Sequence, residues 1–197
     1  MQDSLFDDAV PLAPHRRELT DGAWLDVRAG WQPDADALFA ALSRDVPWVE
    51  ERRRMYERTL PVPRLLRHYD TGAPLPHPEL ARTRDRLTEL YWDELREPFT
   101  SVGLCLYRDG GDSVAWHGDT IGRGATHDTI VAIVSLGATR PFLLRPRGGG
   151  ASTKLSIGHG DLLAMGGSAQ RTWVHAVPKV PHAGPRISIQ FRVAGVR

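Results

Sequence analysis

The spacing of apolar residues changes near residue 99 of the chain. Upstream of it, the stretches 33–42 and 78–97 carry apolar residues at the spacing of an amphipathic helix. The second stretch has a proline near its start, a position that helices tolerate. Its apolar stripe consists of Leu80, Leu87, Leu90 and Tyr91. We therefore predict two helices in the upstream part.

The rest of the upstream part has no clear period. Residues 1–20 are polar and interrupted by prolines, so we expect an extended segment. The charged stretch 48–60 leaves helix and strand open. The stretch 61–78 is rich in proline and lacks the alternation of a strand, which predicts an irregular or hairpin-like connection.

Downstream of residue 99, short β-type runs are separated by turns. The predicted strands lie within segments 101–107, 113–119, 128–136, 140–146, 152–157, 162–167, 171–177 and 186–193. Many short strands at close spacing are typical of a sandwich or barrel. We predict an α+β, mainly β fold in a single domain. It comprises an extended segment over about 1–20, a helical portion over about 21–98 and a β core over about 99–197.

Composition limits the classes of function. The chain has 197 residues, of which 41% are hydrophobic and 25% charged, as in an ordinary soluble domain. With a formal net charge of +1, any nucleic-acid contact must use a local basic surface. Cys105 is the single cysteine, which excludes an internal disulfide and a cysteine-rich zinc site. No signal peptide or membrane span is evident, so we expect a cytoplasmic monomer without a membrane partner.

Three His-x-Asp triplets, at 68–70, 117–119 and 159–161, raise the question of a metal site. The first lies in the proline-rich stretch, which favours a surface loop. The third contains Gly160 and follows Gly158, and we expect both glycines to adopt unusual backbone angles in a structural turn. The second follows a strand-like run and is therefore the best candidate.

On a strand, residues two apart face the same side. His117 and Asp119 are then expected to project together, with Trp116 and Gly118 on the other side. His175, on another strand-like run, supplies a third ligand. Two histidines and one carboxylate with open positions are typical of non-haem Fe(II) oxygenases. Zinc fits the same ligands, but an enzymatic zinc site needs a separate general base, and none is evident.

The last predicted strand alternates regularly. Arg186, Ser188, Gln190 and Arg192 share one face, and Ile187, Ile189, Phe191 and Val193 share the other. Two arginines on one face could hold both ends of a dicarboxylate. The alternative is a surface strand with two solvated arginines.

Five motifs then resemble one family. They are LYRDGGDSVAWHGD, AIVSLGATRPFLLR, GHGDLLAMGG, RTWVHAVPK and PRISIQFR, in this order. They resemble the AlkB-like Fe(II)- and 2-oxoglutarate-dependent dioxygenases over about residues 99–193, with a weaker similarity upstream to VPRLLRHYD. The resemblance implies a double-stranded β-helix, or jelly roll, with the metal in its open mouth. It also implies a nucleotide-recognition lid, which would lie within about 21–98.

The resemblance assigns roles to single residues. His117, Asp119 and His175 match the iron ligands and form the implied catalytic centre. Arg186 matches the arginine that pairs with the distal carboxylate of 2-oxoglutarate, and Arg192 matches a second arginine near the metal. The implied cofactors are Fe(II), 2-oxoglutarate as co-substrate, and O2.

Three further residues are implied in co-substrate binding. Tyr107 matches a tyrosine that hydrogen-bonds the co-substrate. Cys105 and Ser188 stand where the family often has asparagine. Both changes remove an amide donor, for which serine substitutes in part and cysteine only weakly. We therefore expect 2-oxoglutarate to bind with altered affinity.

The implied reaction removes alkyl groups oxidatively from bases of DNA, or of RNA, and releases aldehyde, succinate and CO2. The base must be flipped out of a duplex or presented in single strand. The ring of His117 and Tyr69 are candidates to stack on it. Ile121 stands where nucleobase-repairing members commonly have an acidic residue, which puts the usual substrate preference in question.

Other substrate contacts have simpler alternatives. Trp173 matches a family tryptophan two residues before the last ligand, with core packing as the alternative. Arg145 and the arginines at 64, 67, 140 and 147 are candidates to contact phosphates, with solvated surface charge as the alternative.

Two other functions remain open. Ile121 and the near-neutral charge favour an oxygenase of the same chemistry acting on a protein, lipid or small molecule. The third alternative is a β-barrel that binds a metal without catalysing a reaction. The full ligand set and both arginines argue against it.

The N-terminus adds one partner. Gln2–Phe6, with the sequence QDSLF, resembles the short peptide by which bacterial replication and repair proteins dock on the sliding clamp. A flexible terminus is the alternative.

Overall fold

The computed structural model describes residues 15–55 and 58–196. Its strands are β1 His15–Glu18, β2 Ala23–Arg28, β3 Arg52–Met55, β4 Arg58–Pro61, β5 Leu65–Tyr69, β6 Phe99–Tyr107, β7 Val114–His117, β8 Val131–Gly137, β9 Arg140–Pro146, β10 Thr153–Ile157, β11 Leu162–Gly167, β12 Trp173–Val177 and β13 Arg186–Val193. Its α-helices are α1 Ala35–Asp45, α2 Pro78–Leu90, α3 Trp92–Leu95 and α4 Ala169–Thr172. Two single 3-10 turns are η1 Thr20–Gly22 and η2 Arg123–Ala125. The Gln2–Phe6 peptide lies outside the described residues.

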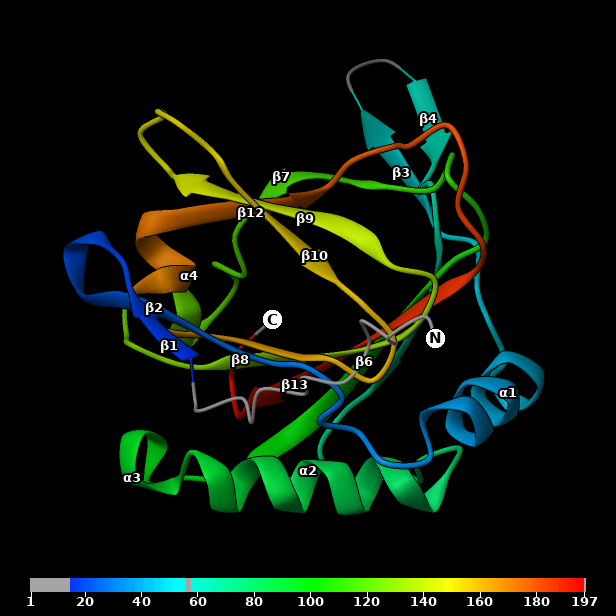
Figure 1. Ribbon diagram of the computed structural model, residues 1–197, viewed down its shortest axis with the longest axis horizontal. Helices are drawn as coiled ribbons and strands as arrows, with labels where there is room; N and C mark the ends of the chain where they lie inside the picture. Colours follow the sequence, from blue (N-terminus) through cyan, green and yellow to red (C-terminus); the bar gives the residue numbers. More distant parts are fainter. Residues whose placement is uncertain (1–14, 56–57, 197) are drawn as a thin grey trace, which may run out of the picture.

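Two antiparallel sheets face each other across one core (Figure 1). The larger has the order β1-β2-β11-β8-β13-β6-β5 and the smaller the order β10-β9-β12-β7. A separate β3–β4 hairpin completes the strands that the structure describes. Two such sheets form the predicted jelly roll, so the expectation of a mainly β fold is confirmed. The upstream strands β1, β2 and β5 belong to the larger sheet together with strands from the downstream part.

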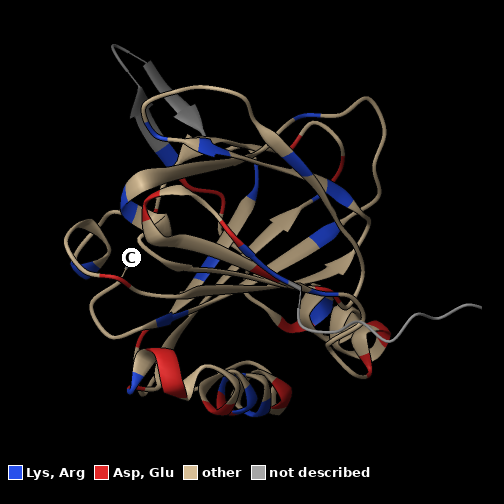
Figure 2. Cartoon of the chain, turned by 60° about the vertical axis from the view of Figure 1, so that its left-hand side comes forward, with Lys and Arg blue, Asp and Glu red and all other residues tan. Residues whose placement is uncertain are grey.

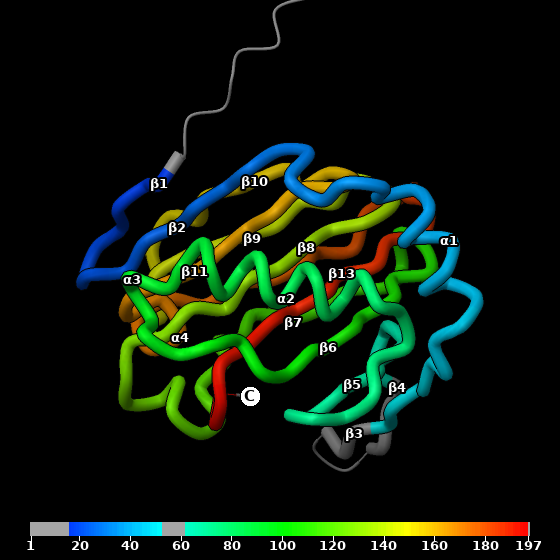
Figure 3. The backbone as a smooth tube through the Cα atoms, turned by 90° about the horizontal axis from the view of Figure 1, so that it is seen from below, coloured from blue at the N-terminus to red at the C-terminus, as the bar shows by residue number. Residues whose placement is uncertain are grey.

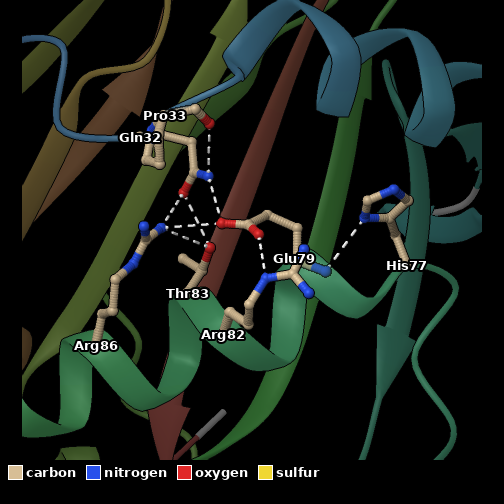
Figure 4. A network of polar contacts seen from close by, with 7 residues as sticks. All are labelled: Gln32, Pro33, His77, Glu79, Arg82, Thr83 and Arg86. Atoms are coloured by element: carbon tan, nitrogen blue, oxygen red, sulfur yellow. Dashed lines mark hydrogen bonds and ion pairs between the residues drawn. The ribbon is translucent and has the colours of Figure 1, made fainter.

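Helix α2 covers the outer face of the larger sheet and contacts β6 (Figure 3). Its buried residues include Leu80 and Leu87, which belong to the predicted stripe. A polar network fixes its first turns to the loop before α1 (Figure 4). Gln32 Nε2 donates to Glu79 Oε1 at 3.0 Å, and Gln32 Oε1 accepts from Thr83 Oγ1 at 2.9 Å. The helix is therefore attached by both apolar packing and hydrogen bonds.

The predicted strands of the downstream part are all present, and β13 shows why. It lies between β8 and β6 at the centre of the larger sheet. Its apolar face, Ile187, Ile189, Phe191 and Val193, is at most 1% exposed. Burying each such side chain stabilises the fold by about 1.5–3 kcal/mol. The opposite face is also covered, since Arg186 is 1% exposed. The alternative of a surface strand with solvated arginines is therefore wrong.

Two upstream expectations need correction. The helix expected over 78–97 ends at Leu90, because Tyr91 leaves the helical conformation and its hydroxyl donates to Asp26 Oδ2 at 3.0 Å. A separate turn, α3, follows. The connection expected over 61–78 contains strand β5, which pairs with β6. The segment 65–69 is free of proline, so its backbone N–H groups are available for the sheet.

The turn predicted at 159–161 is present. Asp161 Oδ2 accepts from the Gly158 amide at 2.7 Å, and His159 Nδ1 accepts from the Gly137 amide at 2.8 Å. Gly160 has φ of +78°, whereas Gly158 does not adopt a positive φ, so only one of the two expected glycine angles occurs. Asp161 is thus engaged within the turn, and His159 connects the turn to the end of β8.

Among the described residues, no helix combines the length and the apolar character that crossing a membrane requires.

Candidate metal centre

Three potential metal ligands meet between the two sheets. His117 ends β7, Asp119 follows it by two residues, and His175 lies in β12. The strands β7 and β12 are antiparallel neighbours in which His175 stands opposite His117. One ligand atom from each of the three residues lies within 4.8 Å of the others. Strand pairing, and not only the His-x-Asp spacing, therefore builds the cluster.

Asp119 lies beyond the end of β7 and not on the strand as expected. Its backbone amide donates to Gln170 Oε1 at 3.3 Å, and its Oδ2 accepts from Arg192 Nη2 at 3.1 Å. Gly118 lets this segment pass close to α4, because a Cβ there would lie 2.9 Å from the Gln170 carbonyl oxygen. Local packing thus directs the carboxylate toward the two histidines.

The electrostatics favour the ligand forms of Asp119 and His175. Burial raises the pKa of the Asp119 carboxyl, but Arg192 and the two histidines outweigh it and the pKa falls below its ordinary value. Burial, with a contribution from His117, lowers the pKa of His175 to about 3. A carboxylate and a neutral imidazole are the states in which these groups bind a metal.

The two imidazoles are held by different neighbours. His117 Nδ1 lies 2.9 Å from the Ala115 carbonyl oxygen, which can only accept, so Nδ1 carries the hydrogen and Nε2 is left as the ligand atom. The His175 ring stacks on Phe142 at 5.2 Å between centroids. Two histidines and one carboxylate form the facial triad that binds non-haem Fe(II), so this arrangement fits a ferrous ion.

Arg186 forms the anion-binding end of the same cavity. It is 1% exposed, its Nε donates to Ser135 Oγ at 2.8 Å, and its Nη1 is buried without a partner among the described residues. Burial lowers the pKa of Arg186, and the Tyr107 ring lies 5.2 Å from the guanidinium carbon. A buried guanidinium with an unused donor is costly unless an anion pairs with it. The donor set therefore fits a carboxylate ligand.

Tyr107 and Arg192 complete the polar wall. Tyr107 is 3% exposed, and burial raises the pKa of its phenol to about 12, so the hydroxyl keeps its hydrogen and can donate. Arg192 Nε is buried and has no partner among the described residues. Arg192 is thus engaged with Asp119 on one side and has a free donor on the other.

A cavity of about 380 Å³ joins these groups. Its lining includes every predicted metal and co-substrate residue, namely His117, Asp119, His175, Tyr107, Arg186, Arg192, Ser188 and Cys105. A second cavity of about 680 Å³, which we call the outer cavity, shares Cys105, Ile121, Gln190 and Arg192 with it. Ile121 is 67% exposed, so it lies at the entrance between the two.

Three predicted substrate residues lie outside both cavities. Tyr69 is 8% exposed and packs in the core. Trp173 is also 8% exposed and packs in the core, and its Nε1 donates to the Thr20 carbonyl at 3.4 Å. The Arg145 guanidinium lies 4.1 Å from the centre of the Trp116 ring. Packing positions explain the first two, and a cation–π contact explains the third.

The other four candidate phosphate-binding arginines, besides Arg145, differ in their surroundings. Arg140 is 1% exposed, and its guanidinium donates to the carbonyl oxygens of residues 109, 112 and 178, so its expected phosphate contact is wrong. Arg147 is engaged with the carbonyls of residues 170 and 171. Arg64 lines the metal cavity and Arg67 the outer cavity.

Sequence reasoning missed several residues in and around the two cavities. Phe142 could have been found from the alternation of its strand, which turns it inward. His68 and Asp70 line the outer cavity as a pair 3.1 Å apart, whereas a surface loop was expected. Gln170 gives no signal in the sequence, because its contact with Asp119 joins α4 to a distant segment.

Comparison with known proteins gives a consistent result. A family model described as the 2OG-Fe(II) oxygenase superfamily matches residues 32–192. The chain is 36% identical over 183 residues to alpha-ketoglutarate-dependent dioxygenase alkB homolog 3 of Bos taurus, covering 81% of this chain and 61% of the relative. It is 28% identical over 196 residues to DNA oxidative demethylase ALKBH2 of Arabidopsis thaliana, covering 79% and 61%. The chain thus spans 61% of the length of these two relatives.

Solved structures share the fold. An oxidoreductase of the 2OG-Fe(II) oxygenase family from Burkholderia pseudomallei superposes with a TM-score of 0.62 at 14% identity, covering 87% of this chain and 84% of that one. A prolyl-4-hydroxylase from Pseudomonas putida superposes with a TM-score of 0.58 at 18% identity, covering 87% and 93%.

Proposed function

Because this chain belongs to the 2OG-Fe(II) oxygenase superfamily and is AlkB-like, we propose that it removes alkyl groups oxidatively from damaged bases of nucleic acid. The observation that carries the proposal is that one cavity contains both a cluster of metal ligands and a buried arginine that can bind an anion. The His117–Asp119–His175 cluster lies at one side of it, and the buried Arg186 with its unpaired donor lies at another. These are the two requirements of a ferrous site that takes a dicarboxylate co-substrate.

The residues of the cavity have separate tasks in this proposal. His117, Asp119 and His175 hold Fe(II), and Arg186 pairs with the distal carboxylate of 2-oxoglutarate. Tyr107 donates a hydrogen bond to the co-substrate, and the apolar side chains of the cavity limit the access of water. Bound together, Fe(II), 2-oxoglutarate and O2 supply the oxidation, which releases succinate, CO2 and an aldehyde.

A nucleic-acid substrate is supported by the relatives and by the outer cavity. One relative is named a DNA oxidative demethylase. The outer cavity lies beside the metal cavity and has Arg67 in its wall. In Figure 2 the basic residues are spread over the sheets and the helices, so we expect few phosphate contacts near the cavities. We propose DNA before RNA as the substrate.

A specific observation favours a second candidate. Ile121, at the entrance, is the most exposed of the large hydrophobic side chains that the structure describes, at 67%. An exposed isoleucine at this position and a net charge of +1 suit an oxygenase with a protein, lipid or small-molecule substrate.

Succinate formation with and without methylated oligonucleotides separates the two. Purified protein with Fe(II) and 2-oxoglutarate is incubated with single- and double-stranded DNA and RNA that carry defined methylated bases, and succinate and formaldehyde are measured. The proposal expects both products to rise together with one class of oligonucleotide. Succinate without stimulation by any oligonucleotide would favour the second candidate, and no succinate from metal-loaded protein would reject both.

A further inference from the structure

Gln190 lies on the cavity face of β13, between Ser188 and Arg192. It is 9% exposed and lines both the metal cavity and the outer cavity. Its Nε2 donates to the Ser188 carbonyl oxygen at 3.0 Å and to Ser188 Oγ at 2.7 Å. Its Oε1 lies 3.7 Å from Cys105 Sγ, within reach of the thiol. A single amide therefore contacts both residues that stand in place of the family asparagines.

The orientation of this amide follows from its backbone contact. A carbonyl oxygen can only accept, so the Gln190 atom that lies 3.0 Å from the Ser188 carbonyl must be the NH2 group. An amide turned by 180° would place two oxygens against each other. The same NH2 group reaches Ser188 Oγ, so the serine oxygen must be the acceptor in that contact.

The hydrogen of the Ser188 hydroxyl is consequently left over. Among the described residues, the bond from Gln190 is the one hydrogen bond recorded at Ser188 Oγ. Ser188 is 4% exposed and lines the metal cavity, two residues after Arg186. A buried hydroxyl hydrogen without a partner is unfavourable, and the cavity is where an acceptor can enter. A dicarboxylate carries acceptors and no donors.

The thiol of Cys105 is used differently. Its weak S–H donor points to Gln190 Oε1, so it is not directed at a ligand in the cavity. Gly103 provides the space for this arrangement, since it stands opposite Gln190 and a Cβ there would lie 2.8 Å from Gln190 Oε1. The amide is thus held between a glycine, a thiol, a hydroxyl and a carbonyl.

We propose that Gln190 is a positioning residue that holds the Ser188 hydroxyl as a hydrogen-bond donor toward the co-substrate carboxylate. The inference rests on the proposed function, because it takes 2-oxoglutarate as the ligand of the cavity. In this arrangement Ser188 contacts the ligand and Gln190 acts through Ser188. The serine takes over the donor role, and the cysteine does not.

A double-mutant cycle on 2-oxoglutarate binding tests the proposal. Isothermal titration of Mn(II)-loaded protein with 2-oxoglutarate, without turnover, gives the Kd of wild type, Ser188→Ala, Gln190→Met and the double variant. Ser188→Ala is expected to raise the Kd about tenfold, the value of one hydrogen bond to a charged group. Gln190→Met is expected to raise it about threefold to tenfold, because the hydroxyl is then free to rotate. When Ser188→Ala is already present, adding Gln190→Met should change the Kd less than about twofold.

Gln32→Met is the matched control, since Gln32 is also a buried glutamine but belongs to the α2 network of Figure 4. It is expected to lower the thermal midpoint and to leave the Kd unchanged. Losses that add up in the double variant, or an unchanged Kd in Gln190→Met, would overturn the positioning role alone. Absence of 2-oxoglutarate binding by wild type would overturn the proposed function and, with it, this inference.

Discussion

Replacing Arg186 by methionine separates ligand binding from stability. Arg186 is 1% exposed, and its Nε donates to Ser135 Oγ at 2.8 Å. Its Nη1 is buried without a partner. Methionine fills a similar volume without polar atoms. The change therefore removes a buried charge whose main partner, in the proposed function, is the ligand.

The two effects have different magnitudes. Truncating one partner of a buried, hydrogen-bonded charge pair costs about 3 kcal/mol of binding, which raises the Kd of 2-oxoglutarate roughly a hundredfold. The ligand-free protein loses the bond to Ser135, about 1 kcal/mol, and is relieved of an unpaired buried charge. We therefore expect the ligand-free variant to unfold with a free energy within about 1 kcal/mol of wild type, or higher.

Denaturant unfolding with and without 2-oxoglutarate measures both effects on Mn(II)-loaded protein. At a ligand concentration of about 100 times the wild-type Kd, wild type should gain about 2.7 kcal/mol and Arg186→Met about 0.4 kcal/mol. Arg140→Met is the matched control. Arg140 is equally buried, but its guanidinium donates to three backbone carbonyls, so its loss should cost about 3 kcal/mol or more without ligand. If ligand-free Arg186→Met lost a similar free energy of unfolding, and 2-oxoglutarate stabilised it as much as wild type, the reasoning would be refuted.

Three further predictions concern the metal and the helix. Asp119→Ala should abolish iron-dependent succinate formation and weaken Mn(II) binding, measured by calorimetry; surviving turnover would reject the ligand assignment. Gly118→Ala should lower the affinity for Mn(II), because its Cβ would lie 2.9 Å from the Gln170 carbonyl oxygen, whereas Gly148→Ala, with nothing within 4 Å, should not. Although burial raises the pKa of Glu79, hydrogen bonds from Gln32 and Arg82 lower it below the ordinary value, so its stabilisation is full above about pH 4.5 and is lost as the pH falls. Glu79→Gln should therefore show a flatter dependence of unfolding free energy on pH between about 5 and 3, and equal slopes would count against the network of Figure 4.

The β core was predictable because alternation and burial coincide there. In β13, every second residue enters the core, and the other face carries the polar side chains of the cavity. The ordered motifs then predicted the metal and co-substrate residues, and all of the predicted residues line one cavity. Local patterns sufficed wherever a residue's role depends on its own strand.

Roles that depend on contacts between distant segments could not be predicted. Tyr69 has an aromatic ring of the kind that stacks on bases, but β5 joins the larger sheet and directs this ring into the core. Arg140 looks like a surface charge in the sequence, whereas three carbonyls from two other segments surround it. Gln170 approaches Asp119 only because α4 packs beside the segment after β7. None of these contacts produces a periodic pattern of apolar and polar residues in the nearby sequence.

The position of β7 at the border of the smaller sheet has a consequence for local opening. This four-residue strand pairs with β12 alone, and its last residue, His117, stands opposite His175. An ion held by both histidines closes a loop of 58 residues and ties the border strand to its neighbour. Amide hydrogen exchange in β7 should then slow on metal binding, whereas exchange in β13, at the centre of the larger sheet, should change little. Loss of metal and fraying of this border are thus coupled, and each makes the other easier.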